Sequence, residues 1–147
     1  MNKKCLNIIA ALILFFFLTV PVFSTMAASS ITWYGYDKGI SLAKEKKKKI
    51  YINFHADWCG YCRKMEKETF VDPKVVSFLN DNFISVRINS DKEPKLAQKF
   101  NVRGLPANFF LTDQGEPIGN QPGYLDVKNF LNILNFVKDE KYKKTAK

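Results

Sequence analysis

The spacing of apolar residues changes repeatedly along the chain between the period of a strand and the period of a helix. Short runs rich in β-branched and aromatic residues predict strands. The last two of these runs flank Thr112-Asp113-Gln114-Gly115, a hairpin signal in which Gly115 would take the left-handed conformation. We expect strands at residues 49–56, 83–88, 107–111 and 116–121.

The segments between these strands place apolar residues three and four positions apart, which predicts amphipathic helices. One helix start is marked by Asp72 and Pro73, because aspartate caps a helix N-terminus and proline fits the first turn. Pro94 fits the first turn of another helix in the same way. We expect helices at residues 37–47, 59–69, 92–100 and 126–138, with a short one from Pro73.

The predicted order is one extra helix followed by β-α-β-α-β-β-α, with the short helix placed after the first helix of that series. This is the order of an α/β protein with a single domain. At 147 residues the chain is long enough for one domain with a substantial hydrophobic core. We assign residues 29–147 to this domain, with its core at about residues 37–137 and a basic tail after it.

The first 28 residues carry an apolar run of another kind. Two lysines precede an apolar stretch over residues 6–20, and Thr25-Met26-Ala27 supplies small residues of the type that precede a cleavage site. We interpret residues 1–28 as a signal peptide. The alternative is an uncleaved membrane anchor, since the apolar stretch approaches the length that spans a bilayer. In both cases the domain would face an extracytoplasmic compartment, where disulfide exchange is ordinary chemistry.

The net charge of +9 comes largely from two lysine clusters, at residues 44–49 and 138–147. A basic surface of this kind suggests nucleic acid as a partner. We do not expect nucleic acid binding, because the chain carries an export signal and a pair of closely spaced thiols. We interpret the clusters as a solvated helix end and a frayed tail, and leave open that they attract acidic partners or anionic lipid.

Cysteine usage singles out one pair. Cys5 lies in the segment interpreted as a signal peptide, so Cys59 and Cys62 remain, too few to staple a small domain. Cys59 opens a predicted helix, where unpaired backbone N–H groups and the helix dipole favour the thiolate. Cys62 follows about one turn later and can close a disulfide with it. The pair predicts a redox dithiol, and we expect no cofactor and no metal, since His55 is the only histidine.

Two motifs extend this prediction. Trp58-Cys59-Gly60-Tyr61-Cys62 follows a predicted strand, and Gly104-Leu105-Pro106 precedes a later one, an arrangement that resembles the thioredoxin family. Ala56-Asp57-Trp58-Cys59, the run from Lys64 to Phe70 and Asp72-Pro73-Lys74-Val75 are similar to exported thioredoxin-like domains of the type found at the C-terminus of the thiol:disulfide interchange protein DsbD. The resemblance implies a thioredoxin-like fold, in which helices flank a central mixed β-sheet.

The same resemblance implies roles for individual residues. Cys59 would be the exposed attacking nucleophile, and Cys62 the more buried resolving thiol. Pro106 would form a cis peptide bond with Leu105 and present backbone groups to an extended substrate. Trp58 would shield the site and Tyr61 would tune the redox potential. With Leu105, they would form the surface that contacts the substrate.

Two positions concern proton transfer. The family commonly has an aspartate where this chain has Asn53, and an amide cannot take up a proton, so help from a general base on that strand is in doubt. Glu66 matches a glutamate of the DsbD-like domains and would lie one helical turn beyond Cys62. There it would raise the thiol pKa and relay a proton. The alternative for Glu66 is a solvated residue on the helix surface.

We therefore expect an exported thiol:disulfide oxidoreductase, acting as a reductant. The segment between Asp72 and Lys99 is too short for the helical insertion of DsbA-type oxidants. The alternatives are an oxidase or isomerase of the same fold, and a non-catalytic binding or metal-handling module. We expect a monomer that exchanges electrons with protein dithiols and disulfides, including a membrane electron-transfer protein. Its compartment would be the bacterial periplasm or envelope, since the sequence shows no ER-retention signal.

Overall fold

A mixed sheet with strand order β1-β3-β2-β4-β5 forms the centre of the protein. The computed structural model describes residues 30–145, so the predicted signal peptide lies outside the described residues. β1, β2 and β3 are parallel, whereas β4 runs antiparallel to both β2 and β5. The strands are β1 (Trp33–Tyr34), β2 (Lys49–His55), β3 (Phe83–Asn89), β4 (Ala107–Leu111) and β5 (Pro117–Pro122).

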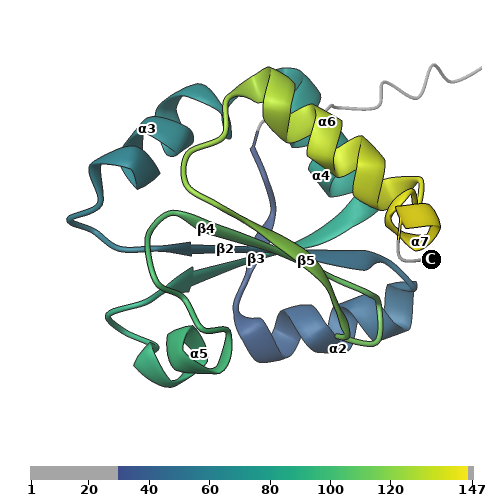
Figure 1. Cartoon of the computed structure of the whole chain (residues 1–147), viewed down its shortest axis with the longest axis horizontal. Helices are drawn as coiled ribbons and strands as arrows, with labels where there is room; N and C mark the ends of the chain where they lie inside the picture. The colour runs from purple at the N-terminus through teal and green to yellow at the C-terminus, as the bar shows by residue number, and fades with distance from the viewer. Residues whose placement is uncertain (1–29, 146–147) are drawn as a thin grey trace, which may run out of the picture.

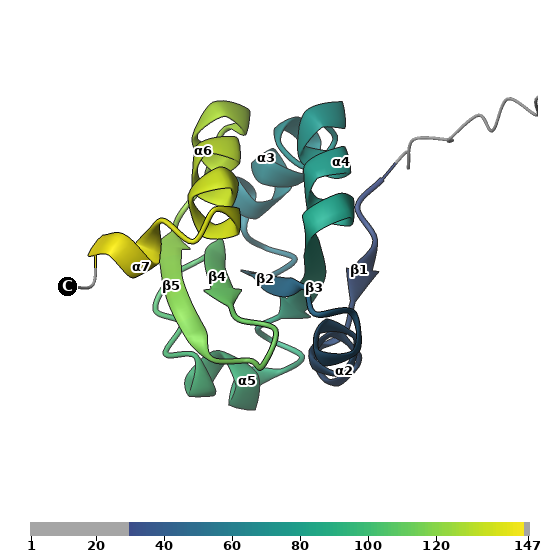
Figure 2. The ribbon, with the colours of Figure 1, turned by 90° about the vertical axis from the view of Figure 1, so that its right-hand side faces the viewer.

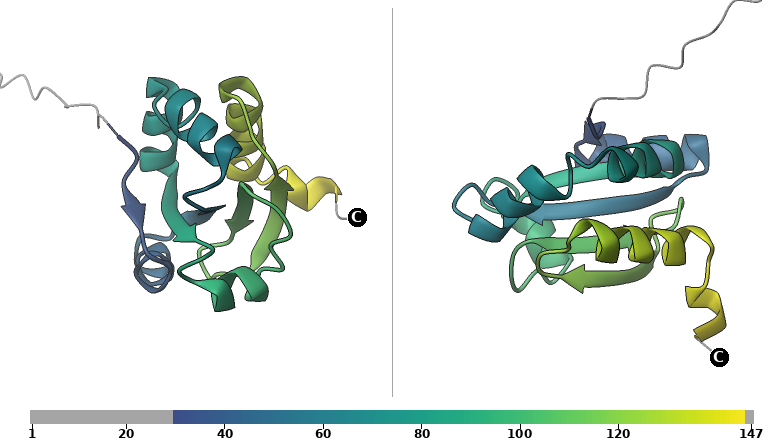
Figure 3. Two further views of the ribbon diagram at one scale, coloured as in Figure 1. Left: turned by 90° about the vertical axis from the view of Figure 1, so that its left-hand side faces the viewer. Right: turned by 90° about the horizontal axis from the view of Figure 1, so that it is seen from above.

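Helices cover both faces of the sheet, as Figures 1 and 2 show. On one face lie α3 (Gly60–Glu68), α4 (Pro73–Asn82) and α6 (Val127–Lys138). On the other face lie α2 (Tyr36–Lys46) and α5 (Pro94–Lys99), and the short α7 (Tyr142–Thr145) follows α6 at one end of the molecule (Figures 1 and 3). This arrangement is the predicted α/β fold, a thioredoxin-like mixed sheet between two layers of helices in a single domain.

Each face of the sheet has its own hydrophobic core, because successive side chains of a strand point to opposite faces. Tyr51 of β2 packs with Met65 and Phe130 beneath α3, α4 and α6. Its neighbour Ile52 packs with Phe109 and the residues beneath α2 and α5. β2 is buried along nearly its whole length, so the predicted central strand is confirmed.

Local signals in the sequence account for most element ends. The Asp72 Oδ1 accepts hydrogen bonds from the backbone N–H of Lys74 (2.9 Å) and of Val75 (3.2 Å), which confirms the predicted cap. Pro73 occupies the first turn, and Gly115 has a φ of 85°, the left-handed conformation expected in the hairpin. α5 begins at Pro94 and not at residue 92 as predicted, because a proline disfavours the helical conformation in the residue before it, and Glu93 is not helical.

Two elements were not predicted. β1 is only two residues long, too short to show a strand pattern, and it pairs with Ser85 and Val86 of β3. The C-terminal segment, predicted to be a frayed tail, forms α7 as far as Thr145. The Glu140 carboxylate anchors this segment by accepting from Lys49 Nζ (3.1 Å) and Lys143 Nζ (2.6 Å). Within residues 30–145, no helix is long and apolar enough to cross a membrane.

Candidate active site

The two cysteines lie where the central strand β2 gives way to α3. Cys59 is the N-cap of α3, with the extended backbone typical of that position, and its Sγ accepts a hydrogen bond from the backbone N–H of Cys62 (3.1 Å). The two residues form a disulfide, with their Cα atoms 5.2 Å apart. The structure is therefore that of the oxidised pair. The pair lies at the N-terminus of α3, where the helix dipole favours negative charge on sulfur.

Burial of the pair departs from the expectation that Cys59 is exposed. Cys59 is 4% exposed and Cys62 is 2% exposed, and both pack with Ala56 and Leu105. The reason is local, since the Cys59 sulfur bonds to Cys62 and turns toward the first turn of α3. In the oxidised state the two sulfur atoms therefore differ in their position on the helix more than in their exposure.

Leu105 lies beside the disulfide, and Pro106 follows it directly before β4. The Leu105–Pro106 peptide bond is cis, which confirms the expectation of a cis bond, and Leu105 packs against the two cysteines. The Pro106 carbonyl accepts a hydrogen bond from the backbone N–H of Gly123 (2.8 Å). This bond fixes the proline loop against the segment that follows β5, so two loops distant in sequence border the site together.

Exposed aromatic side chains flank the pair. Trp58 is 69% exposed, and its indole Nε1 donates to Asp91 Oδ2 (2.9 Å), which holds the loop after β2 to the loop after β3. Tyr61 is 63% exposed, and its ring lies 6.5 Å from that of Tyr124. Tyr124 was not predicted, because nothing in the sequence brings the segment after β5 to α3. Its hydroxyl donates to Glu68 Oε2 (2.7 Å), and this bond raises the pKa of Tyr124.

Glu66 lies on α3 one turn beyond Cys62 and forms an ion pair with Arg87 of β3. Glu66 is therefore not simply solvated, although its side chain is partly exposed. The Arg87 guanidinium also lies 5.6 Å from the centre of the Trp33 ring, and most of its side chain is buried beneath α3. The sequence does carry a signal for Arg87, since it is the single charge in the predicted strand 83–88, but we did not single it out.

Asn53 belongs to a buried network of neutral groups. Its Nδ2 donates to Asn108 Oδ1 (3.1 Å), and the Tyr51 hydroxyl donates to the same oxygen (2.7 Å). Asn108 Nδ2 in turn donates to the backbone carbonyls of Gln121 (3.0 Å) and Gly123 (3.1 Å). The network therefore connects β2 through β4 to the loop that holds Pro106.

Two titratable groups near the site have shifted pKa values. Burial raises the pKa of Tyr51 well above its ordinary value, so this hydroxyl stays protonated and serves as a donor. Burial also lowers the pKa of His55, and the nearby positive charge of Arg87 lowers it further. His55 is half-buried at the end of β2, in keeping with the prediction that it packs in the strand. Over residues 30–145, no three histidine, cysteine or acidic side chains are grouped as metal ligands would be.

Comparisons with known proteins agree with this geometry. A family model described as a thioredoxin-like domain matches residues 36–138. The thiol:disulfide interchange protein DsbD of Photorhabdus laumondii is 36% identical over 94 residues, which covers 60% of this chain and 16% of that protein. DsbD of Vibrio vulnificus is 36% identical over 100 residues, covering 65% of this chain and 17% of the relative. The chain thus spans less than a fifth of the length of these relatives.

Solved structures share the fold. A thioredoxin from Thermus thermophilus superposes with a TM-score of 0.68 at 27% identity, over 74% of this chain and 87% of that one. A DsbH oxidoreductase superposes with a TM-score of 0.65 at 19% identity, over 76% of this chain and 86% of the other. At that identity, the second likeness concerns the fold alone.

Proposed function

Because this chain belongs to the thioredoxin-like family, whose model matches residues 36–138, we propose that it is an exported thiol:disulfide oxidoreductase that reduces partner proteins. The observation that carries the proposal is the Cys59–Cys62 pair at the start of α3, packed against the cis Leu105–Pro106 loop. A helix N-terminus stabilises a thiolate, and the second sulfur lies within bonding distance of the first.

The reaction begins with the pair reduced. The Cys59 thiolate attacks one sulfur of a client disulfide, the other client sulfur leaves as a thiolate, and a mixed disulfide forms. Cys62 then attacks the Cys59 sulfur, the second client thiolate leaves, and the Cys59–Cys62 disulfide closes as in this structure. Two electrons pass to the client. A dithiol protein must then reduce the pair, which is the role we assign to a membrane electron-transfer partner.

The residues around the pair would bind the client. We assign Pro106 and Leu105 to the backbone of an extended client segment, and Trp58 and Tyr61 to its side chains, since both aromatics are exposed beside the disulfide. Glu66 would receive or supply the proton of the Cys62 thiol, because it lies one turn further along the same helix face. Its ion pair with Arg87 would keep that carboxylate in place.

The reductant direction and the export rest on separate features. The chain between α3 and β4 holds only α4, β3 and α5, without the helical insertion of DsbA-type oxidants, and the similarity to DsbD supports thiol:disulfide interchange. The apolar stretch over residues 6–20 supports export to a bacterial periplasm.

Reduction of insulin disulfides with dithiothreitol as the electron source tests the proposal. We expect turnover by the wild type and none by Cys59→Ser, whereas Cys62→Ser should accumulate a mixed disulfide. Activity that persists in Cys59→Ser would exclude the mechanism, and zinc or copper uptake without turnover would favour a binding module. Equilibration of the pair in glutathione buffers tests the direction, since a strongly oxidising potential would identify an oxidase.

A further inference from the structure

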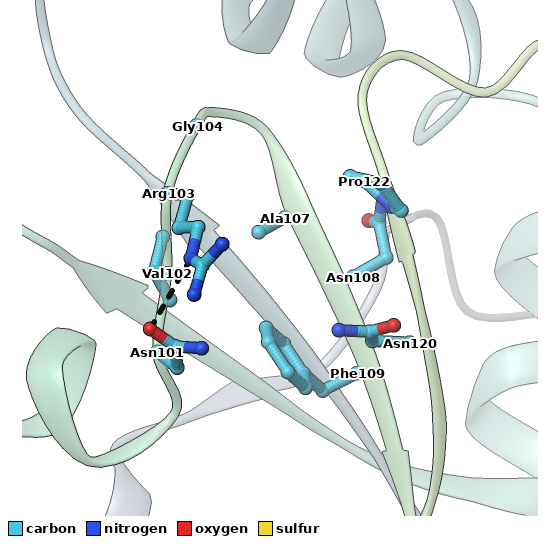
Figure 4. Close-up of a pocket in the computed structure, with 9 residues that line it drawn as sticks. All are labelled: Asn101, Val102, Arg103, Gly104, Ala107, Asn108, Phe109, Asn120 and Pro122. Carbon is cyan, nitrogen blue, oxygen red and sulfur yellow. Dashed lines mark hydrogen bonds between the residues drawn. The ribbon is translucent and has the colours of Figure 1, made fainter.

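A pocket of about 220 Å³ lies directly behind the proline loop, and the mechanism above does not use it. Figure 4 shows its two walls: Arg103 and Asn101 lie on one side, Asn120 on the other, with Ala107 and Phe109 between them. The first wall is the loop that leads into Leu105–Pro106, and the second is the edge strand β5. We call it the Arg103 pocket.

The pocket adjoins the reaction site. Gly104 forms part of its rim, and the next residue, Leu105, packs against the two cysteines. Arg103 and Leu105 are two residues apart, so their Cα atoms are separated by at most about 7 Å. A client segment that lies along Leu105 would therefore also pass the opening of the pocket. The client residue at the pocket would be only a few positions from the client cysteine that Cys59 attacks.

The chemistry of the pocket is that of an anion site. The Arg103 guanidinium makes one long hydrogen bond, from Nε to Asn101 Oδ1 (3.5 Å), and it joins no ion pair with any side chain of the described part of the chain. Asn120 is exposed on the opposite wall, and none of the residues that line the pocket is acidic. The planar fork of a guanidinium fits a carboxylate through two parallel hydrogen bonds.

We propose that the Arg103 pocket binds an aspartate or glutamate side chain of the client, two or three residues from the reacting cysteine. The positive charge of the domain acts in the same direction, because it attracts acidic clients to the surface before they dock. Residues 29–147 keep 21 of the 23 lysines and arginines against all 14 acidic residues. The inference rests on the proposed function, since it concerns how the client of that reaction is selected.

Two disulfide peptides that differ only in Glu or Gln, placed two residues from the cystine, test the proposal. We expect the wild type to reduce the Glu peptide with a kcat/KM roughly three- to tenfold higher than that for the Gln peptide. A gain of this size is typical of a charge-assisted hydrogen bond that is partly exposed to solvent. Arg103→Gln should lose this preference and keep its rate on the Gln peptide, whereas Arg103→Lys should keep part of it, because it retains the charge but not the fork. Lys128→Gln, an exposed change of equal charge on α6, is the control and should keep the full preference.

The outcomes separate the two proposals. If neither peptide is reduced by the wild type, the proposed function fails. If both peptides are reduced but Arg103→Gln keeps the preference for Glu, the pocket proposal is overturned and the function stands. An equal loss on both peptides would also overturn it, because Arg103 would then support the loop and not select the client.

Discussion

Glu66 and Arg87 form an ion pair between α3 and β3, one helical turn beyond the buried Cys62. Asn53, which takes the place of the family's strand aspartate, is the residue of β2 directly across from Arg87 in the sheet. The carboxylate that pairs with the arginine therefore comes from the helix that carries the dithiol, and not from the strand beneath it.

Removal of Arg87 should affect both stability and redox chemistry. In Arg87→Met the Glu66 carboxylate loses its partner, and an unpaired negative charge near Cys62 disfavours the thiolate. We expect a more negative reduction potential in glutathione buffers and a loss of about 1–2 kcal/mol in the free energy of unfolding. Glu66→Gln combined with Arg87→Met should restore the potential but not the stability. A potential that does not move in Arg87→Met would separate the ion pair from the redox chemistry.

Substitutions in the buried amide network should destabilise the fold to different extents, because its members make different numbers of hydrogen bonds. Asn108→Leu would leave two donors and two backbone carbonyls without their partner, so we expect a loss of about 3–5 kcal/mol in the free energy of unfolding. Tyr51→Phe removes one of two donors to the same oxygen and should cost about 1 kcal/mol. Urea unfolding of both variants measures the difference. Equal losses would show that the network does not converge on Asn108.

The lowered pKa of His55 makes the free energy of unfolding depend on pH in a defined direction. Its pKa is lowered in the folded state, first by burial and then by the charge of Arg87, so the unfolded chain binds the proton more readily. The stabilisation is therefore present above the unfolded pKa of about 6.5 and is lost as the pH falls below it. We expect the free energy of unfolding of wild type to fall between about pH 7.5 and pH 5.5. His55→Gln should show a shallower slope over this range, and an unchanged slope would refute the assignment.

At Gly39 of α2, helix propensity and packing favour different residues. Alanine is favoured over glycine inside a helix by about 1 kcal/mol, but a Cβ on Gly39 would overlap Cγ2 of Val86 in β3. Overpacking of this kind costs about 1–3 kcal/mol, so we expect Gly39→Ala to lower the melting temperature despite the better propensity. Gly119→Ala is the control, since its Cβ would meet open space. A stabilised Gly39→Ala variant would mean that α2 shifts away from the sheet at little cost.

The sequence was sufficient for features that depend on local chemistry. Asp72 and Pro73 start α4 as predicted, and the Leu105–Pro106 bond is cis as the motif implied. These signals work because a cap, a turn or a family motif is written in adjacent residues.

Features that depend on register between distant segments were missed. Arg87 meets Glu66 only because β3 pairs with β2 in one particular register beneath α3, and apolar spacing does not state that register. Tyr124 reaches Tyr61 only because the segment after β5 folds back toward α3. β1 was missed for a different reason, since two residues carry no periodicity.

The amide network at Asn53 also has a consequence for pH. Gln121 and Gly123 offer only carbonyl oxygens, so the Asn108 amide nitrogen must face them and its oxygen must face Asn53. An aspartate in place of Asn53 would lack the N–H that donates to this oxygen, so it could keep a hydrogen bond to Asn108 only in its protonated form. Burial would raise the pKa of such an acid, because it disfavours the charged form. With the amide of Asn53 in its place, the network keeps its hydrogen bonds unchanged over the pH range in which thiols titrate.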